Sequence, residues 1–314
     1  MPPKNKRGNN RRTLKFLLDT NDVLISYRQS FYQVLRFLGK GGNAQTYLVL
    51  CTKGENRGVL FAAKVFYRIT KPERRAEFLA ETKLLEQISH PCIMKIFDYG
   101  QKEDAFPFMI VQHLDRTLDH QLPSFKNDVL TKLTYCVQLC AALNFLASQQ
   151  IVHRDVKPAN IFLQGSSCVL GDFGLAKALV SPEADRMTPL KNSVGPGMPL
   201  AYRTPDLVAY ANGSRPLGVE SDVFQAGLVL TKLFTRKNPQ RSVGRTEILT
   251  PVELDPIPHV QERLGPAITN LLHSMLNLDP SQRPSADDLL SSWEGLLIDE
   301  ARFCDRQRVG DRYK

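Results

Sequence analysis

The sequence lacks the features of a membrane-spanning or secreted protein. No apolar run approaches the roughly 18 residues that a membrane-spanning helix needs. The longest such run, residues 224–234, is interrupted by Gln225, Thr231 and Lys232. The N-terminus has no apolar core ending in small residues, which a secretory signal would have. We therefore expect a soluble protein without a transmembrane segment, located in the cytoplasm.

Cysteine pairs of the kind that bind zinc are also absent. The chain of 314 residues has six cysteines, and none of them forms a C-x₂-C pair. This excludes the common structural zinc sites, and so few thiols in a chain of this length are typical of a reducing compartment. Hydrophobic residues make up 42% of the chain and charged residues 23%. Both fractions are ordinary for a folded protein, and the length is sufficient for two lobes.

Positive charge is present in excess, and much of it lies at the N-terminus. The formal net charge is +9, and the first twelve residues contain no acidic residue but five basic ones: Lys4, Lys6, Arg7, Arg11 and Arg12. We interpret residues 1–12 as a basic, disordered tail. Contact of this tail with nucleic acid or an anionic membrane is the less favoured interpretation, because charge alone is nonspecific.

Hydrophobic periodicity predicts an α+β protein whose first part is rich in strands and whose second part is helical. Residues 61–66 and 108–111 are short apolar runs typical of strands, and residues 73–89 have helical spacing. Further helices are expected at residues 129–148, 222–235 and 266–277. Residues 181–218, rich in Pro, Gly, Ser and Thr, are expected to form a loop.

A glycine-rich turn lies between two strand-like runs near the start of the first part. Glycines allow a backbone to approach phosphate oxygens closely. The pattern alone is weak, because an ordinary hairpin would look the same, and it is not a Walker A loop. The candidate phosphate- and nucleotide-contacting residues of this turn are Leu38, Gly39, Lys40, Gly41, Gly42, Ala44 and Thr46.

A lysine lies within the next strand. Lys64 follows Ala62 in an apolar run, and a buried ammonium needs a partner. The predicted helix that follows offers Glu81. A Lys64–Glu81 pair would direct the ammonium toward phosphates, whereas the alternative is a surface lysine and a surface glutamate.

The most specific motif is His153-Arg154-Asp155 followed by Lys157 and Asn160. It fits the pattern HRDxxxxN at every defined position. Phosphoryl transfer needs a carboxylate that orients the acceptor hydroxyl, and Asp155 suits that role. It also needs positive charge near the transferred phosphoryl group, which Lys157 offers.

Asp172-Phe173-Gly174 follows ten residues after Phe162. Hard cations such as Mg²⁺ prefer oxygen ligands, and Asp172 and Asn160 provide them. Each residue alone is compatible with a charged loop, but the complete set in this order rarely arises by chance.

With these motifs the sequence resembles the eukaryotic-type protein kinase family over residues 32–296. The resemblance implies a two-lobed, protein-kinase-like α+β fold. It has a small strand-rich N-lobe with one main helix at residues 32–111, a hinge at residues 112–114, and a larger helical C-lobe at residues 115–296. Residues 13–31 then form an N-terminal extension and residues 297–314 a C-terminal tail.

The resemblance also implies an ATP- and Mg²⁺-dependent serine/threonine kinase, with Mn²⁺ as an alternative metal. The catalytic residues would be Asp155, Lys157, Lys64 and Glu81, and the metal ligands Asn160 and Asp172. The adenine and phosphates would contact the glycine-rich turn together with Ala62, Lys64, Gln112, His113, Leu114 and Phe162, with Val111 at the back of the pocket. Leu85, Ile96, His153 and Phe173 would stack between the lobes. Asp222 would anchor the catalytic loop, and Arg283 would pair with Asp206.

Some positions depart from the family pattern. Ala44 replaces the third glycine of the turn, and Thr46 replaces the usual valine. Pro199 stands where the family usually has a threonine that supports Asp155, and Thr204 is too far along the chain to replace it. Protein substrates are expected, including the protein itself.

Regulation by phosphorylation is expected from one further feature. In the family the arginine at the position of Arg154 commonly joins a basic pocket for a phosphorylated loop. Thr188 and Ser193 are the candidate autophosphorylation sites.

Three other functions compete with an active protein kinase. A pseudokinase scaffold would lack one of the transfer residues, and all of them are present. A nucleic-acid-binding protein would carry a reading motif, which the sequence lacks. A small-molecule kinase would share the catalytic loop, but Asp279-Pro280-x-x-Arg283-Pro284 and the segment before it favour a protein acceptor.

Overall fold

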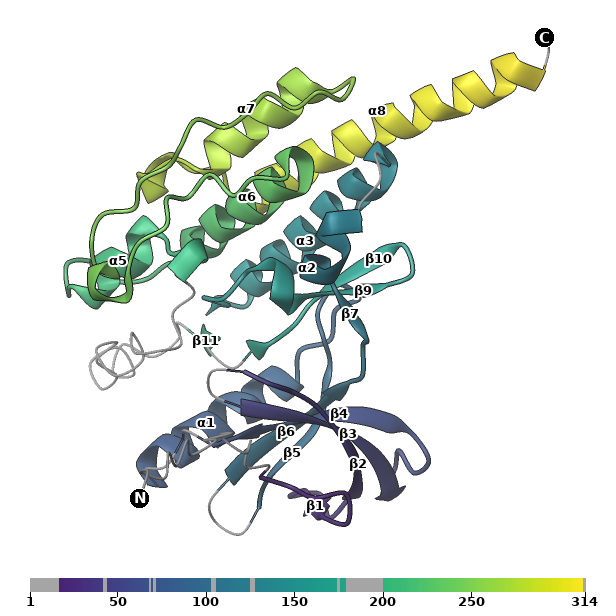
Figure 1. Cartoon of the computed structure of the whole chain (residues 1–314), viewed down its shortest axis with the longest axis vertical. Coiled ribbons are helices and arrows are strands. Elements are labelled where there is room, and N and C mark those ends of the chain that lie inside the picture. Colours follow the sequence, from purple (N-terminus) through teal and green to yellow (C-terminus); the bar gives the residue numbers. More distant parts are fainter. Residues whose placement is uncertain are drawn as a thin grey trace, which may run out of the picture.

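A computed structural model describes most of the chain. The described residues are 17–41, 44–67, 69, 72–102, 106–124, 128–173, 176–178 and 200–312. They form a strand-rich N-terminal lobe and a helical C-terminal lobe (Figure 1). The expected α+β class with two lobes is confirmed.

The N-terminal lobe is built on a six-stranded antiparallel sheet in the order β1-β2-β3-β4-β6-β5. Its strands are β1 (Val23–Ile25), β2 (Phe31–Lys40), β3 (Ala44–Lys53), β4 (Leu60–Phe66), β5 (Ile96–Lys102) and β6 (Phe106–Gln112). One face buries aromatic and β-branched side chains, among them Tyr32, Val49 and Phe61. Burial of such side chains is the main favourable term in the stability of a sheet of this kind.

The described part of the extension, residues 17–31, contributes a strand to this sheet. The sequence predicts residues 13–31 as an extension packing on the lobe, and in the structure β1 pairs with β2 and an isolated bridge joins Ser26 to Gly100 of β5. The two ends of the sheet are therefore connected. An open edge exposes unpaired backbone groups, and β1 covers the edge of β2.

The main helix of this lobe, α1 (Pro72–Glu86), packs on β5 and β6. Phe78 of α1 contacts Phe66 of β4, with ring centroids 4.5 Å apart. The helix begins at a proline, which is favourable at a first helical position, and ends three residues before the predicted end.

The C-terminal lobe contains most of the helices. They are α2 (Leu118–Gln121), α3 (Val129–Ser148), α5 (Pro205–Ala211), α6 (Glu220–Thr235), α7 (Gly265–Met275) and α8 (Ala286–Arg312). Short strands lie where the lobes meet (Figure 1): β7 (Arg116–Thr117), β8 (Ile151–Val152), β9 (Ile161–Gln164), β10 (Ser167–Leu170) and β11 (Lys177–Ala178).

Helix α3 is the central helix of this lobe, and its bounds are those that the sequence predicts. The Asp128 side chain caps it by accepting a hydrogen bond from Thr131 N at 3.3 Å. It packs on α8, α6 and β10, and so it is buried on more than the one stripe expected. By length and composition α3 would also suffice to cross a membrane, but half of that apolar window is buried within the protein. A core helix meets the same criterion.

Two sequence predictions are wrong in this lobe. Residues 205–211, expected to be loop, form α5, because Thr204 caps the helix and Pro205 occupies its first position. The sequence predicts a C-terminal tail at residues 297–314 that finishes a last helix and frays from about Cys304, whereas the last turns of α8 continue to Arg312 (Figure 1). Arg263 stabilises these turns through ion pairs with Asp299 at 3.2 Å and Glu300 at 2.9 Å.

Candidate active site

The catalytic loop follows β8 and starts with a buried histidine. His153 is fully buried, and its Nε2 lies 2.9 Å from the Gly171 carbonyl oxygen. Its ring meets the Phe173 ring edge-on, with centroids 4.9 Å apart. Burial lowers the pKa of His153 to about 4, so the imidazole is neutral near pH 7. Phe173, Leu85 and Ile96 belong to one large buried cluster, and the ring contact is the part of the expected stack that the structure describes directly.

Helix α6 holds the backbone of this loop. The Asp222 carboxylate accepts hydrogen bonds from His153 N at 2.6 Å and from Arg154 N at 2.8 Å. The predicted anchoring role of Asp222 is confirmed. Burial raises the pKa of Asp222 to about 7, and the two amides and Arg154 oppose that rise. Arg154 has φ 66°, and a strained backbone of this kind persists only when its surroundings fix it.

Gln225 is a loop-positioning residue that sequence reasoning missed. Its Oε1 accepts from Val156 N at 2.8 Å, and its Nε2 donates to the carbonyls of Arg154 at 3.2 Å and Tyr202 at 2.8 Å. It therefore links the catalytic loop to the chain before α5. Its position three residues after Asp222, on the same helix face, is the only signal in the sequence.

Asp155 is buried beside the two partners that the motif supplies. Its Oδ2 accepts hydrogen bonds from Lys157 Nζ and Asn160 Nδ2, both at 2.8 Å. Its Oδ1 is buried and has no hydrogen-bond partner among the described residues. Burial raises the pKa of Asp155, and the nearby Asp172 carboxylate adds to this, while Lys157 opposes it. The carboxylate thus keeps one unsatisfied acceptor, as a group that receives a hydroxyl proton requires.

Asp172 of the C-terminal lobe forms an ion pair with Lys64, which lies in β4 of the N-terminal lobe. Burial raises the pKa of Asp172, but Lys64 outweighs it and holds the pKa below its usual value. Asp172 also has φ 64°. The predicted partner Glu81 lies in α1, but its side chain is outside the described part of the chain, so the Lys64–Glu81 pair stays a prediction.

The predicted nucleotide-contacting residues come from neighbouring strands and the connection between the lobes. Thr46 of β3 pairs with Lys64 of β4, and Ala62 pairs with Val111 of β6. The remaining positions are assigned as follows: Leu38, Gly39 and Lys40 end β2, Gly41 follows it, Gly42 lies outside the described residues, His113 and Leu114 follow β6, and Phe162 is in β9. Gln112, predicted to be hinge, is the last residue of β6.

The glycine-rich turn is closed by a short backbone contact. Gly41 N donates to Ala44 O at 2.8 Å, and the Tyr67 hydroxyl donates to Gly41 O at 3.0 Å. Ala44 is only 2% exposed and packs in the core between the lobes. Its methyl group therefore fills core space, which explains why alanine is accommodated where the family pattern has glycine.

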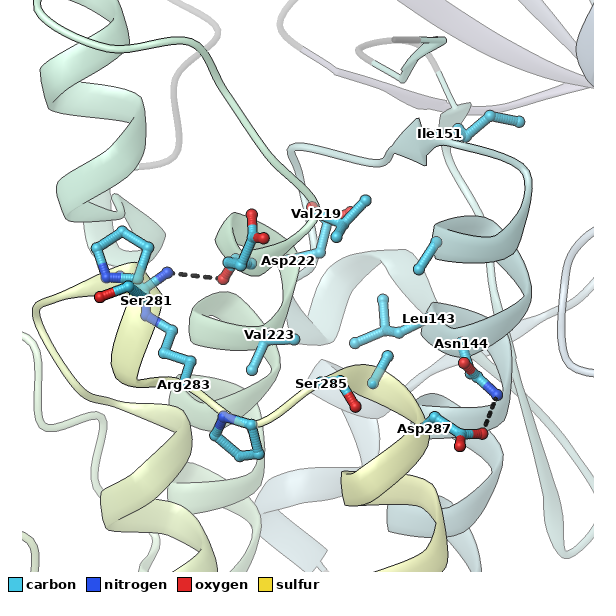
Figure 2. Close-up of a pocket in the computed structure, with 15 residues that line it drawn as sticks. Leu143, Asn144, Ile151, Val219, Asp222, Val223, Ser281, Arg283, Ser285 and Asp287 are labelled. Carbon is cyan, nitrogen blue, oxygen red and sulfur yellow. Dashed lines mark hydrogen bonds between the residues drawn. The ribbon is translucent and has the colours of Figure 1, made fainter. Parts of the chain in front are cut away.

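Asp206 and Arg283 form a buried ion pair at 2.8 Å, with side chains 3% and 0% exposed. The predicted pairing is confirmed. The Arg283 guanidinium also donates to the carbonyls of Glu220 at 2.7 Å and Asn277 at 2.8 Å. Figure 2 shows this arginine beside an open pocket of about 280 Å³ that residues of α3, the start of α6 and the start of α8 line. Asp222 lines the pocket, so the wall of the pocket and the anchor of the catalytic loop share one side chain.

The candidate regulatory residues are only partly described. Thr188, Ser193 and Pro199 lie outside the described residues, whereas Arg154 is held by Asp222 as above. Thr204 cannot replace the missing threonine, because its hydroxyl caps Leu207 N at 2.9 Å and bonds Ser221 Oγ at 2.8 Å. This agrees with the argument from spacing.

Comparisons with known proteins agree with this geometry. Residues 32–293 match the family model described as the protein kinase domain. The chain is 28% identical to a probable serine/threonine-protein kinase nek3 of Dictyostelium discoideum, over 82% of this chain and 23% of that protein. It is 28% identical to the serine/threonine-protein kinase Nek3 of Mus musculus, over 82% of this chain and 48% of the relative. The mouse serine/threonine-protein kinase PLK2 is 29% identical, over 81% and 36% respectively. The chain thus spans less than half the length of these relatives.

Proposed function

Because this chain belongs to the protein kinase family, we propose that it transfers the γ-phosphoryl group of ATP to serine and threonine hydroxyls of proteins. One observation carries the proposal: the buried Asp155 keeps an unsatisfied carboxylate oxygen beside Lys157 and Asn160. The ion pair between Lys64 and Asp172 joins two further charges of the transfer set. The whole set is present, which favours catalysis over a scaffold without transfer activity.

Each residue has a separate task in this proposal. Asp155 orients the acceptor hydroxyl and receives its proton. Lys157, already paired with Asp155, offsets negative charge on the transferring group. When the nucleotide binds, the Lys64 ammonium moves from Asp172 to the phosphates. His153 stays neutral and keeps the loop packed against Phe173.

The proposed metal is Mg²⁺, held by Asp172 and Asn160. Among the described residues no three His, Cys, Asp or Glu side chains form a metal-binding group. Mg²⁺ nevertheless suits the site, because it commonly takes one or two protein oxygens and completes its shell with phosphates and water. The Asp172 carboxylate is already poised beside a cation, and the Asn160 amide oxygen is a hard donor. A metal held by these two residues would neutralise negative charge on the phosphates.

Serine and threonine are the proposed acceptors for two reasons. The relatives are named serine/threonine kinases. Lys157 is also the residue that such kinases carry two positions after the catalytic aspartate.

The test is incubation of the purified protein with labelled ATP, Mg²⁺ and a generic protein substrate, followed by phosphoamino-acid analysis. We expect phosphoserine and phosphothreonine. Asp155→Asn should lower kcat by about 10²–10⁴-fold, since it removes the proton acceptor. Phosphotyrosine alone would contradict the acceptor class. Bound nucleotide without any transfer would instead support a scaffold.

We further propose autophosphorylation at Thr188 or Ser193, recognised by a basic pocket that includes Arg154. Phosphorylation adds about two negative charges and strong acceptor oxygens, which arginines bind well. Mass spectrometry after incubation with ATP, with Asp155→Asn as the control, tests this. Full activity of a protein without phosphate at either residue would reject it.

A cytoplasmic location is proposed from the sequence features together with the state of the cysteines. All six cysteines are free thiols, as a reducing compartment favours. Fluorescence microscopy of the tagged full chain in cells would test the proposal, and a signal confined to an organelle would contradict it.

A further inference from the structure

The segment 17–30, here named the strap, connects the two edges of the N-terminal sheet. Its strand β1 pairs with β2, and Ser26 forms a bridge with Gly100 of β5. Tyr27 N also donates to Tyr99 O at 3.1 Å. Figure 1 shows β1 beside β2 at the end of the lobe farthest from α8. The strap therefore makes backbone contacts with strands at both ends of the main sheet.

The body of the lobe is shaped to accept the strap. A Cβ atom at Gly100 would lie 3.0 Å from Ile25 O and 2.6 Å from the Phe108 ring. A Cβ atom at Gly54 would lie 2.5 Å from Ser30 Oγ, and Gly54 has φ 123°. Both glycines therefore permit a close approach that a larger residue would block.

Side chains fasten the strap at its start and middle. The amides of Leu17 and Leu18 donate to the Tyr47 hydroxyl at 3.1 and 3.2 Å, and Leu18 is buried. Asp22 forms an ion pair with Lys102 of β5. A segment with this many fixed contacts is a structural part of the lobe, although the family model starts only at residue 32.

The last side chain of the strap reaches α1. Arg28 Nη2 lies 3.0 Å from Oε2 of Glu86, the last residue of α1. Glu86 is only 10% exposed, and its Oε1 is buried without a hydrogen-bond partner among the described residues. Burial raises the pKa of Glu86, while Arg28 favours its charged form. Arg28 is the only cation within 4 Å that the structure describes for this buried carboxylate. Without Arg28 the carboxylate would be buried and unpaired, which would destabilise the position of the end of α1.

The residue before Glu86 leads to the active site. Leu85 belongs to the large buried cluster that runs from α1 into the C-terminal lobe and also contains Phe173, and Phe173 follows the Asp172 that pairs with Lys64. Movement at the end of α1 would thus disturb the packing under the nucleotide-binding charges. Interiors are close-packed, so a shift at one side chain is transmitted to its neighbours.

We propose that the strap positions α1, with Arg28 acting through Glu86 to hold the end of the helix, whose Leu85 belongs to the buried cluster that also contains Phe173. The strap thereby sets the geometry in which Lys64 and Asp172 bind the nucleotide. Arg28 touches no substrate in this arrangement and is a positioning residue. The kinetic part of the proposal rests on the proposed kinase activity, whereas the structural part does not.

The first experiment compares Arg28→Ala with Arg57→Ala in the full chain. Arg57 is an exposed arginine in the turn between β3 and β4 and serves as the matched control. Amide hydrogen exchange within residues 72–86 should become faster in Arg28→Ala and stay unchanged in Arg57→Ala. kcat/KM for ATP should fall by about two- to fivefold in Arg28→Ala, the size expected from losing a partly exposed ion pair.

The second experiment exchanges the charges. Arg28→Glu and Glu86→Arg should each accelerate exchange in α1, and the double variant should recover most of the protection, which a nonspecific loss of stability would not allow. Unchanged exchange in α1 of Arg28→Ala would overturn the proposal, whether or not the protein transfers phosphate. Equal acceleration over the whole sheet, without recovery in the double variant, would also overturn it. If hydrogen exchange responds as expected but neither the wild type nor any variant transfers phosphate, the proposed kinase function is wrong, whereas the structural role of the strap is supported.

Discussion

The two lobes hold their parts of the active site by different means. In the C-terminal lobe, Asp222 and Gln225 fix the catalytic loop through buried hydrogen bonds to its backbone. In the N-terminal lobe, Lys64 is held by an ion pair whose side chains are 21% and 30% exposed, and Arg28 of the strap, 60% exposed, pairs with Glu86, which is 10% exposed. Removing one partner of a buried polar contact strongly lowers the free energy of unfolding, whereas removing one partner of an exposed ion pair changes it little. The C-terminal part of the site should therefore be rigid, and the N-terminal part adjustable.

The largest expected effect is on the buried pair of the C-terminal lobe. Arg283→Ala would leave the Asp206 carboxylate buried without its cation. We expect the free energy of unfolding to fall by about 3–5 kcal/mol, measured by chemical denaturation. Arg241→Ala is the control, because its ion pairs with Glu253 and Asp255 are exposed. Equal effects of the two variants would remove the distinction between buried and exposed pairs.

The next effect is a dependence of stability on pH. The pKa of His153 falls from 6.5 to about 4 on folding, because the ring is buried. The unfolded chain therefore binds a proton at higher pH than the folded one. The contribution of the neutral, buried ring to the free energy of unfolding is therefore fully present above pH 6.5. As the pH falls from 6.5 toward 4, protonation of the unfolded chain lowers the free energy of unfolding by on the order of 3 kcal/mol. Denaturation at several pH values should show that the free energy of unfolding depends more steeply on pH in the wild type than in His153→Asn. The same dependence in both proteins would contradict a lowered pKa of His153.

A smaller effect is expected at the anchor of the catalytic loop. Asp222→Asn keeps one acceptor but turns an amide group toward the second backbone N–H. We expect a loss of about 1–3 kcal/mol in the free energy of unfolding together with a lower kcat. The KM for ATP should change little, since Asp222 belongs to the C-terminal lobe. A change in KM with an unchanged kcat would reverse this expectation.

The smallest effect on stability is expected in the N-terminal lobe. Lys64→Met keeps the aliphatic stem in β4 and removes only the ammonium. The free energy of unfolding should change by less than about 1 kcal/mol. Phosphoryl transfer should nevertheless fall by about 10²–10³-fold, because a charge at the phosphates is lost. Calorimetric or fluorescence titration with ATP would separate binding from transfer. A large loss of stability would show that the N-terminal part is as tightly held as the C-terminal part.

Much of the site could be predicted because its residues lie close together in the sequence. One short loop contains Asp155, Lys157 and Asn160, so their spacing in the sequence was enough to predict their chemistry. The family pattern also predicted two long-range contacts correctly, those of Asp222 and Arg283. By contrast, only the spacing from Asp222 on one helix face could have indicated Gln225, because its hydrogen bonds depend on how α6 lies against the catalytic loop.

The wrong predictions also have physical causes. Residues 205–211 looked like a loop because the segment around them is rich in proline, yet a proline is favourable in the first turn of a helix. The family resemblance ends at residue 296 and leaves the following residues as a tail, but Arg263 pairs with acidic residues of α8 and lies over the Phe303 ring, 4.6 Å from the centroid. At α8 a contact with another part of the chain decided the outcome, and at α5 the cap and the proline did.

The sequence by itself determined the chemistry, the order of the motifs and the division into a strand-rich and a helical part, because periodicity and short motifs depend on neighbouring residues. Only the tertiary structure decided that the strap joins both edges of the sheet, that Arg28 meets Glu86, and that Lys64 pairs with Asp172. The last of these pairs joins residues 108 positions apart, and contacts of this kind form only when the whole chain buries its apolar surface.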